Sequence, residues 1–208
     1  MQGLYLVTPD WDDTARLLAA TEQALAAGVA LLQYRHKTAS EALRYEQAGK
    51  LQALCRRHGT PFIINDHLAL ALAQELDADG IHVGGTDMSV AAARAALGAG
   101  KLVGASCYGE LQRAHEAAAQ GASYVAFGGF YPSRVKKYAV TTAPQIVARS
   151  RAALAAPVVV IGGMTPENAA PLVAQGAHMV AAISSVYQAS DVGGAVQAFR
   201  ALFAETGL

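Results

Sequence analysis

Polar side chains in the segment QYRHK are the first residues here whose types and spacing could do chemistry. Gln33, Arg35 and Lys37 alternate with Tyr34 and His36, directly after an apolar run typical of a β-strand. Because successive side chains on a strand point to opposite faces, the first three share one face. Two cations and an amide on one inward face need a compensating anion, since burying an unpaired charge is costly. The pattern therefore indicates an anion site, although a solvated strand end would explain any one of the cations alone.

Carboxylates follow two of the next apolar runs. Asn65 and Asp66 end the run FIIND, and Asp87 follows GIHVGG. Mg²⁺ is commonly bound by one or two carboxylates together with the phosphate oxygens of a substrate. Asp66 could instead be a turn or capping residue. Asp87 could cap the helix that follows it, but Ser89 could do so equally well. We interpret Asp66 and Asp87 as ligands of Mg²⁺, which is the predicted cofactor.

A hydroxyl and a long basic segment are further candidates. Ser106 ends the run LVGASC without the His and Asp pattern of a hydrolase nucleophile, so we interpret it as an oriented hydroxyl donor. The segment GGFYPSRVKKYAVTTAP is long for a connection in a compact domain, and such segments are usually functional. Its Ser133, Arg134 and Lys136 could bind a second anion. A solvated run of charge is the alternative for Arg134.

Two later runs end in small residues. Gly163 ends VVVIGG, where backbone amides can approach a ligand closely, and Thr165-Pro166 after it is typical of a helix start. Ile183 and Ser184 end the last run, MVAAIS. Segments at such positions form a phosphate site in many β/α barrels. With the first anion site and the metal, this suggests a transferase that joins two phosphorylated ligands and displaces diphosphate.

The elements that must position these residues alternate regularly along the chain. Short apolar runs alternate with alanine-rich stretches of helical period, which predicts βαβ units and a parallel sheet. Eight such units close a barrel, so we expect an α/β protein with a single compact (β/α)8 TIM-barrel domain over residues 1–208. A doubly wound open sheet is the main rival, but no G-x-G-x-x-G turn follows the first strand. The expected strands are 4–8, 30–35, 62–66, 80–85, 102–107, 124–130, 158–163 and 179–184, and the expected helices are 12–27, 40–57, 68–76, 89–98, 110–120, 143–155, 166–176 and 192–206.

Composition excludes several classes of protein. Hydrophobic residues make up 53% and charged residues 15%, which a disordered chain would not show. Sixteen basic and sixteen acidic residues balance to zero, so we expect no nucleic-acid partner. No run approaches the roughly 20 apolar residues of a membrane helix, so we expect no membrane partner. Two cysteines and a start without a signal peptide predict a cytoplasmic protein. Near-zero charge mildly favours self-association, and thus a homodimer.

The motifs together resemble one family. QYRHK, IIND, GIHVGGTD, VGAS, GGFYPSRVKK, VVVIGG and AAISS stand in the order and near the spacing of the thiamine-phosphate synthases, from Leu4 to about Tyr187. The resemblance implies an Mg²⁺-dependent coupling of 4-amino-2-methyl-5-hydroxymethylpyrimidine diphosphate with thiazole phosphate. The products are thiamine phosphate and diphosphate. Loss of diphosphate leaves a delocalised pyrimidine cation, which the thiazole nitrogen captures.

The resemblance also implies roles for individual residues. Asp66 and Asp87 match the Mg²⁺ ligands, and Arg35, Lys37, Ser106 and Lys136 serve catalysis. The pyrimidine diphosphate is held by Gln33, Tyr34, Arg35, His36, Lys37, Asn65, Ser106 and Lys136. The thiazole phosphate is held by Ser133, Arg134, Val135, Gly163, Ile183 and Ser184.

The chain departs from the family pattern in places, and other functions stay open. Gly85 and Thr86 stand where the family commonly has Gln-Glu, and Val135 stands where it has a hydroxyl. A related thiazole tautomerase shares the barrel but needs no diphosphate clamp, so the retained clamp and metal residues favour the synthase. A non-catalytic phospholigand-binding barrel is the alternative outside the enzymes. A Schiff-base aldolase is disfavoured, because Lys37 and Lys136 lie at a strand end and in a loop.

Overall fold

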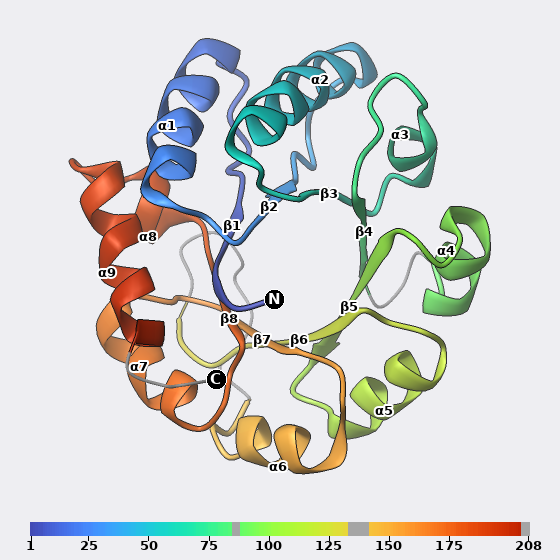
Figure 1. Cartoon of the computed structure of the whole chain (residues 1–208), viewed down its shortest axis with the longest axis vertical. Coiled ribbons are helices and arrows are strands. Elements are labelled where there is room, and N and C mark those ends of the chain that lie inside the picture. The colour runs from blue at the N-terminus through green and yellow to red at the C-terminus, as the bar shows by residue number, and fades with distance from the viewer. Residues whose placement is uncertain (85–87, 133–141, 205–208) are drawn as a thin grey trace.

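A computed structural model of the chain describes residues 1–84, 88–132 and 142–204. Eight parallel strands follow one another around a closed barrel in sequence order, and β1 pairs with β8 to complete it (Figure 1). This confirms the (β/α)8 barrel expected from the alternating pattern. The strands are β1 (Gly3–Val7), β2 (Leu31–Tyr34), β3 (Phe62–Asn65), β4 (Gly80–Val83), β5 (Leu102–Tyr108), β6 (Tyr124–Gly128), β7 (Val158–Ile161) and β8 (Met179–Ala182).

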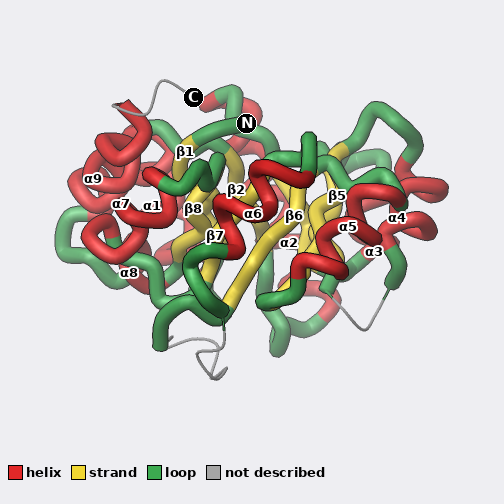
Figure 2. Tube along the Cα trace, turned by 90° about the horizontal axis from the view of Figure 1, so that it is seen from below, coloured by secondary structure: helices red, strands yellow, loops and turns green. Residues whose placement is uncertain are grey.

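Helices form a layer around the strands (Figure 2). They are α1 (Thr14–Ala27), α2 (Glu41–His58), α3 (Leu68–Leu72), α4 (Val90–Leu97), α5 (Leu111–Ala119), α6 (Ile146–Ala153), α7 (Pro166–Ala174), α8 (Ser184–Tyr187) and α9 (Val192–Ala204). Several begin at a side-chain cap that satisfies a free amide of the first turn. Ser89, for example, accepts a hydrogen bond from Ala92 N at the start of α4.

Most expected helices lie within about three residues of their observed bounds, and two places differ more. The helix expected over 68–76 ends at Leu72, because the chain turns at Ala73 and buries Leu76 through a separate turn. The four-residue helix α8 directly after β8 was not expected as a separate element. One helical turn is too short to show a period in the sequence.

The strands divide the apolar side chains between two cores. Outward-facing residues pack against the helices in the larger cluster, and inward-facing residues fill the barrel. The inner cluster contains Tyr5, Val7, Leu31, Ile63, Tyr124, Ala126, Val159, Met179, Ala181 and Ile183. Since inward and outward positions alternate along each strand, the register of the barrel decides which polar residues enter its interior.

Gly104 on β5 makes room for the ring of Tyr124 inside the barrel. A Cβ at this position would overlap the Tyr124 ring, and Tyr124 is fully buried. We expect Gly104→Ala to lower the free energy of unfolding by about 1–3 kcal/mol through overpacking. Denaturant unfolding of both proteins measures this. An unchanged midpoint and slope would mean that the interior adapts freely around the ring.

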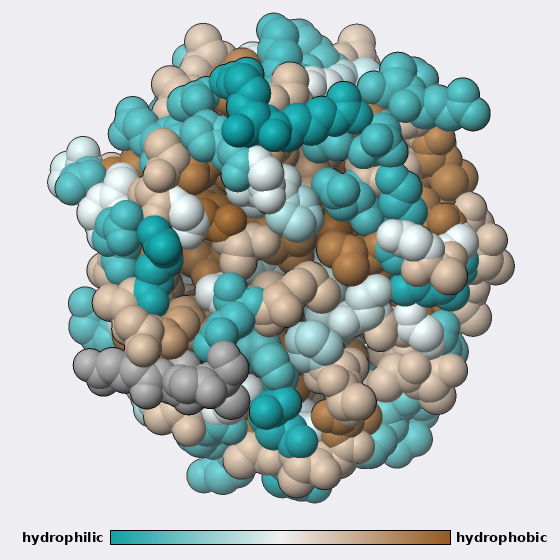
Figure 3. All heavy atoms as spheres, viewed as in Figure 1, coloured by the Kyte–Doolittle hydropathy of each residue, from teal (hydrophilic) through white to brown (hydrophobic). Residues whose placement is uncertain are grey.

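The amino ends of the strands form the face seen in Figures 1 and 3, and the N-terminus lies there. Hydrophilic side chains surround this face, with apolar ones between them (Figure 3). A groove of about 620 Å³ opens at this end, next to Gln2, Gly28 and Arg200. Arg200 is engaged there with the last carbonyl of α1, at 2.7 Å from Ala27 O. No helix among the described residues is both long and apolar enough to cross a membrane.

Candidate active site

The exit of β2 is fixed to the loop after β1. Thr8 Oγ1 donates to the Arg35 carbonyl at 3.0 Å and accepts from Arg35 N at 2.8 Å. Arg35 is only 7% exposed, and its Nη1 lies 3.2 Å from both carboxylate oxygens of Asp10. Asp10 Oδ1 also accepts from Lys37 N at 2.9 Å. The Asp10 carboxylate therefore binds both the Arg35 side chain and the Lys37 backbone, in the segment that we expected to bind an anion.

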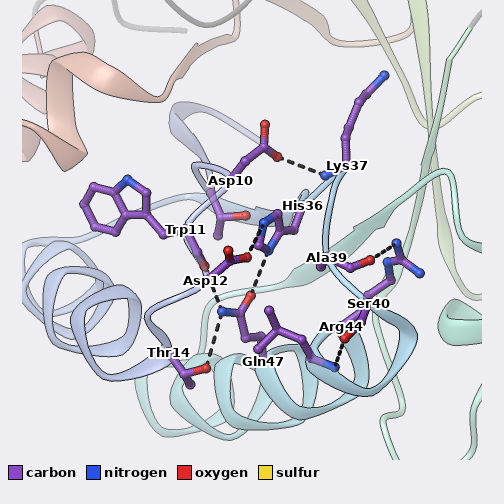
Figure 4. A network of polar contacts seen from close by, with 12 residues as sticks. Asp10, Trp11, Asp12, Thr14, His36, Lys37, Ala39, Ser40, Arg44 and Gln47 are labelled. Carbon is purple, nitrogen blue, oxygen red and sulfur yellow. Dashed lines mark hydrogen bonds and ion pairs between the residues drawn. The ribbon is translucent and has the colours of Figure 1, made fainter.

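The side chains of QYRHK separate as the strand period requires. Gln33 points into the barrel, and Lys37 is exposed with its side chain extending away from the polar network around Asp10 (Figure 4). We expected substrate contacts from Tyr34 and His36 as well, and their placement argues against side-chain contacts. The Tyr34 hydroxyl donates to Gln47 Oε1 on α2 at 3.0 Å, and His36 Nδ1 lies 3.3 Å from the same oxygen.

These two residues instead join β2 to its helix. Gln47 Nε2 continues the network to Trp11 O at 2.9 Å, and His36 Nε2 lies 3.3 Å from Asp12 (Figure 4). The physical reason is the strand period, which places Tyr34 and His36 on the face opposite Gln33 and Arg35. Their role in the described structure is to fix the β1–α1 loop against α2.

Asp66 lies at the carboxyl end of β3 in a left-handed backbone conformation, with φ 60°. This conformation is uncommon outside glycine, although Asp and Asn adopt it more readily than other residues. Asp66 Oδ1 accepts from Gly84 N at 2.8 Å and Oδ2 accepts from Asn65 Nδ2 at 2.7 Å. These bonds fix the carboxylate at the rim between β3 and β4.

The donor chemistry at Asp66 fits Mg²⁺. Each carboxylate oxygen keeps a lone pair beyond the hydrogen bond that it accepts, and Mg²⁺ prefers such hard oxygen ligands. The described residues contain no group of three or more His, Cys, Asp and Glu that could hold a metal by themselves. A metal held at this rim would thus take most of its ligands from substrate oxygens and water, as Mg²⁺ sites commonly do.

Polar residues also meet inside the barrel, beneath the mouth. Tyr5, Gln33, Asn65, His82 and Ser106 line an interior cavity of about 30 Å³, together with apolar residues of the inner core. His82 Nε2 lies 2.9 Å from Ser106 Oγ. His82 is buried, and both of its ring nitrogens lie within hydrogen-bond distance of a side chain. The sequence did not reveal that its partner is a candidate site residue.

The loops after β6 and β7 contact each other closely. Gly163 has φ 63°, and a Cβ there would overlap the Pro132 carbonyl oxygen. Thr142 Oγ1 donates to the Gly128 carbonyl. Tyr131 joins the same loop to α7 through a 2.8 Å hydrogen bond to Asn168 O. The described ends of the long loop are therefore attached to β6 and α7.

A substitution at Gly163 tests the contact between the loops after β6 and β7. We expect Gly163→Ala to destabilise the protein by more than about 1 kcal/mol, because alanine is strained in the left-handed region and its Cβ meets a backbone oxygen. Thermal unfolding measures the effect. Gly59→Ala is the matched control, since Gly59 also has a left-handed φ of 64° but has open space around it. Equal shifts in the two variants would show that the contact with Pro132 adds nothing.

The loop after β7 leads into a well-capped helix. Thr165 caps α7 as expected, and Thr165 and Asn168 form a capping box with Pro166 at the first turn. Asn168 Nδ2 also donates to the Gly163 carbonyl at 2.9 Å. Ile183 and Ser184 follow the neighbouring strand, β8, with Ser184 beginning α8. The last two strands therefore bring Gly163, Ile183 and Ser184 to one side of the mouth.

Five candidate residues lie outside the described residues. They are Asp87, Ser133, Arg134, Val135 and Lys136. The described neighbour Ser89 caps α4, so Asp87 is not needed for that role. Cys107, the neighbour of Ser106, is buried, and burial raises the pKa of its thiol to about 12, so this thiol is not a reactive group of the site.

Comparison with known proteins shows what this chain is similar to. The family model described as thiamine monophosphate synthase matches residues 4–186. A protein of Janthinobacterium sp. (strain Marseille) named thiamine-phosphate synthase is 65% identical over 205 residues, covering 99% of this chain and 98% of that protein. A protein of the same name from Xanthomonas campestris pv. campestris (strain 8004) is 50% identical, covering 98% of this chain and 97% of the relative.

Solved structures give the same result. A thiamine phosphate pyrophosphorylase from Pyrococcus furiosus superposes with a TM-score of 0.84 at 29% identity, covering 100% of this chain and 98% of that one. A 3-hexulose-6-phosphate synthase superposes with a TM-score of 0.72 at 20% identity, covering 97% and 99% of the two chains. The second likeness shows the fold alone.

Proposed function

The chain belongs to the thiamine monophosphate synthase family, and we propose that it couples an aminopyrimidine diphosphate to a thiazole phosphate, with Mg²⁺, to give thiamine phosphate and diphosphate. Membership of this family makes it an enzyme of the transferase class. The observation that carries the proposal is the arrangement at the mouth, where β2 and β3 bring a buried arginine and a fixed carboxylate to the rim and β5 places an oriented hydroxyl beneath it.

Arg35 is the residue that we propose for the leaving diphosphate. Its guanidinium is preorganised by Asp10, and a nearly buried cation stabilises developing negative charge more strongly than an exposed one. Lys37 is exposed and extends away from the Asp10 network, so it can add a second, more adaptable positive charge. We propose from the family pattern that Lys136 also stabilises the negative charge of the leaving diphosphate.

Asp66 would hold Mg²⁺, with Asp87 as the second proposed ligand. When bound, the metal would neutralise charge on the diphosphate oxygens. Asp66 is suited to this task because Gly84 and Asn65 fix its orientation before any ligand arrives. The metal dependence is a proposal that the chemistry of this carboxylate supports.

We propose a dissociative reaction, in which the protein supplies position and charge rather than a nucleophile. The electron-rich aminopyrimidine expels diphosphate, and the nitrogen of the thiazole captures the resulting cation. Gly163, Ile183 and Ser184 are proposed to hold the phosphate of the thiazole, with help from Ser133, Arg134 and Val135. Holding both partners in one mouth removes much of the entropic barrier to their meeting.

Complementation separates this function from those of related barrels. We expect the gene to restore growth without thiamine to a bacterium that lacks thiamine-phosphate synthase. The same gene carrying Arg35→Ala should fail at equal protein levels. A thiazole tautomerase or a phosphate-binding protein would not restore growth, so an unrescued strain with abundant folded protein would contradict the proposal.

A further inference from the structure

A chain of hydrogen bonds crosses the interior of the barrel from β2 to β5. Gln33 Nε2 donates to Tyr5 Oη at 2.6 Å, and Tyr5 Oη lies 2.7 Å from Tyr124 Oη. Tyr124 Oη lies 3.2 Å from His82 Nδ1, and His82 Nε2 lies 2.9 Å from Ser106 Oγ. Both ends of this chain, Gln33 and Ser106, line the cavity beneath the mouth. A residue on β2 is thus connected to one on β5 through three side chains that do not reach the rim.

The direction of the protons along this chain follows from its first member. An amide nitrogen can only donate, so Tyr5 Oη accepts from Gln33. Tyr124 Oη is the one other hydrogen-bond partner of Tyr5 Oη among the described residues, and a buried hydroxyl proton without an acceptor is costly, so Tyr5 gives its proton to Tyr124. Burial raises the pKa of both phenols, so each keeps one proton to give. With its acceptor position taken by Tyr5, Tyr124 gives its own proton to His82 Nδ1, which leaves His82 Nε2 as the donor that faces Ser106.

This direction decides what the two ends present to a ligand. His82 Nε2 donates to Ser106 Oγ, which leaves the proton of Ser106 directed away from His82. At the other end, Gln33 Oε1 accepts no hydrogen bond from the described residues and is available in the cavity. The floor of the mouth therefore offers an acceptor from β2 and a donor from β5.

We infer that this interior chain of hydrogen bonds selects the polar edge of the heterocycle, by fixing Gln33 as an acceptor and Ser106 as a donor. The inference rests on the proposed function and concerns its specificity. A 4-aminopyrimidine presents an amino donor beside a ring-nitrogen acceptor, which complements that pair. A 4-oxopyrimidine presents a carbonyl acceptor beside a ring N–H, which is the reverse. Tyr5, Tyr124 and His82 are positioning residues in this scheme.

Direct binding of two unreactive ligands tests the inference. The 4-amino and 4-oxo forms of the 2-methyl-5-hydroxymethylpyrimidine monophosphate carry no diphosphate to expel, so calorimetry measures recognition without turnover. We expect the wild-type protein to prefer the amino form by about 10²-fold or more, since reversed polar groups stay unpaired in a buried site. Tyr124→Phe interrupts the chain at its centre and should reduce the preference at least about 10-fold.

A second variant and a control keep the test sharp. Tyr5→Phe frees the amide of Gln33 to turn, and should reduce the preference from the other end even if Tyr124→Phe fails to fold. Met179→Leu changes the same inner core at constant volume without touching the chain, and should keep the preference.

The outcomes are distinct. A wild-type preference for the oxo form, or a preference that survives in both folded tyrosine variants, would overturn the inference. A wild-type protein that yields no thiamine phosphate would contradict the proposed function instead. Thiamine phosphate formation together with an unchanged ratio in the variants would leave that function standing and remove the inference alone.

Discussion

Asp66→Asn should lower kcat/KM for thiamine phosphate formation by about 10²–10³-fold and raise the Mg²⁺ concentration needed for half-maximal rate. The substitution removes a charge while keeping the shape of the side chain. Asparagine also tolerates the left-handed conformation that Asp66 adopts, so the backbone should be preserved. The rate measured across a range of Mg²⁺ concentrations gives both quantities.

Asp77→Asn is the matched control for this variant. Asp77 also has a positive φ, of 47°, but it is exposed and pairs with Lys101 at 2.7 Å, away from the mouth. A surface ion pair contributes little to stability because solvent screens it, and activity should stay at the wild-type level. If Asp66→Asn kept the wild-type dependence on Mg²⁺, the assignment of Asp66 to the metal would be wrong.

Arg35→Ala is the second variant with a large expected effect, a loss of about 10²–10³-fold in kcat/KM. Two causes act together. The variant removes a nearly buried cation from the leaving diphosphate, and it leaves the Asp10 carboxylate unpaired beside that anion. Steady-state kinetics with varied pyrimidine diphosphate measures the loss.

A double variant separates these causes. Adding Asp10→Asn to Arg35→Ala removes the unpaired charge, so part of the lost activity should return, and the two substitutions should not be additive. Arg57→Ala is the control, because Arg57 pairs with Glu22 on the outer helical layer, at 2.7 Å, and should leave activity unchanged. Full additivity of the two mouth substitutions would mean that Asp10 does not act through Arg35.

The barrel could be predicted from the sequence because its signal is repeated. Each of the eight apolar runs became a strand, and the period of two placed Gln33 and Arg35 on the face opposite Tyr34. The expectation that Tyr34 and His36 contact the substrate came from the whole QYRHK motif and did not apply the period of two. In the structure both side chains face the helical layer, where they contact Gln47 on α2.

Partners that are distant in the chain could not be predicted. Asp10 and Arg35 come together because β1 pairs with β2, and no residue pattern in either segment predicts their ion pair. His82 had a usable signal, because β4 aligns it with Asn65 on β3 and with Gly104 on β5. A comparison of the polar residues at inward positions of neighbouring strands would have indicated the chain of hydrogen bonds inside the barrel.

The most direct test of the central claim is an incubation of the purified protein with both phosphorylated substrates and Mg²⁺. We expect thiamine phosphate and diphosphate to form in equal amounts, and to form only when both substrates are present. A metal chelator should abolish the reaction. Absence of thiamine phosphate with folded protein and metal present, or an undiminished rate in the presence of the chelator, would contradict the account.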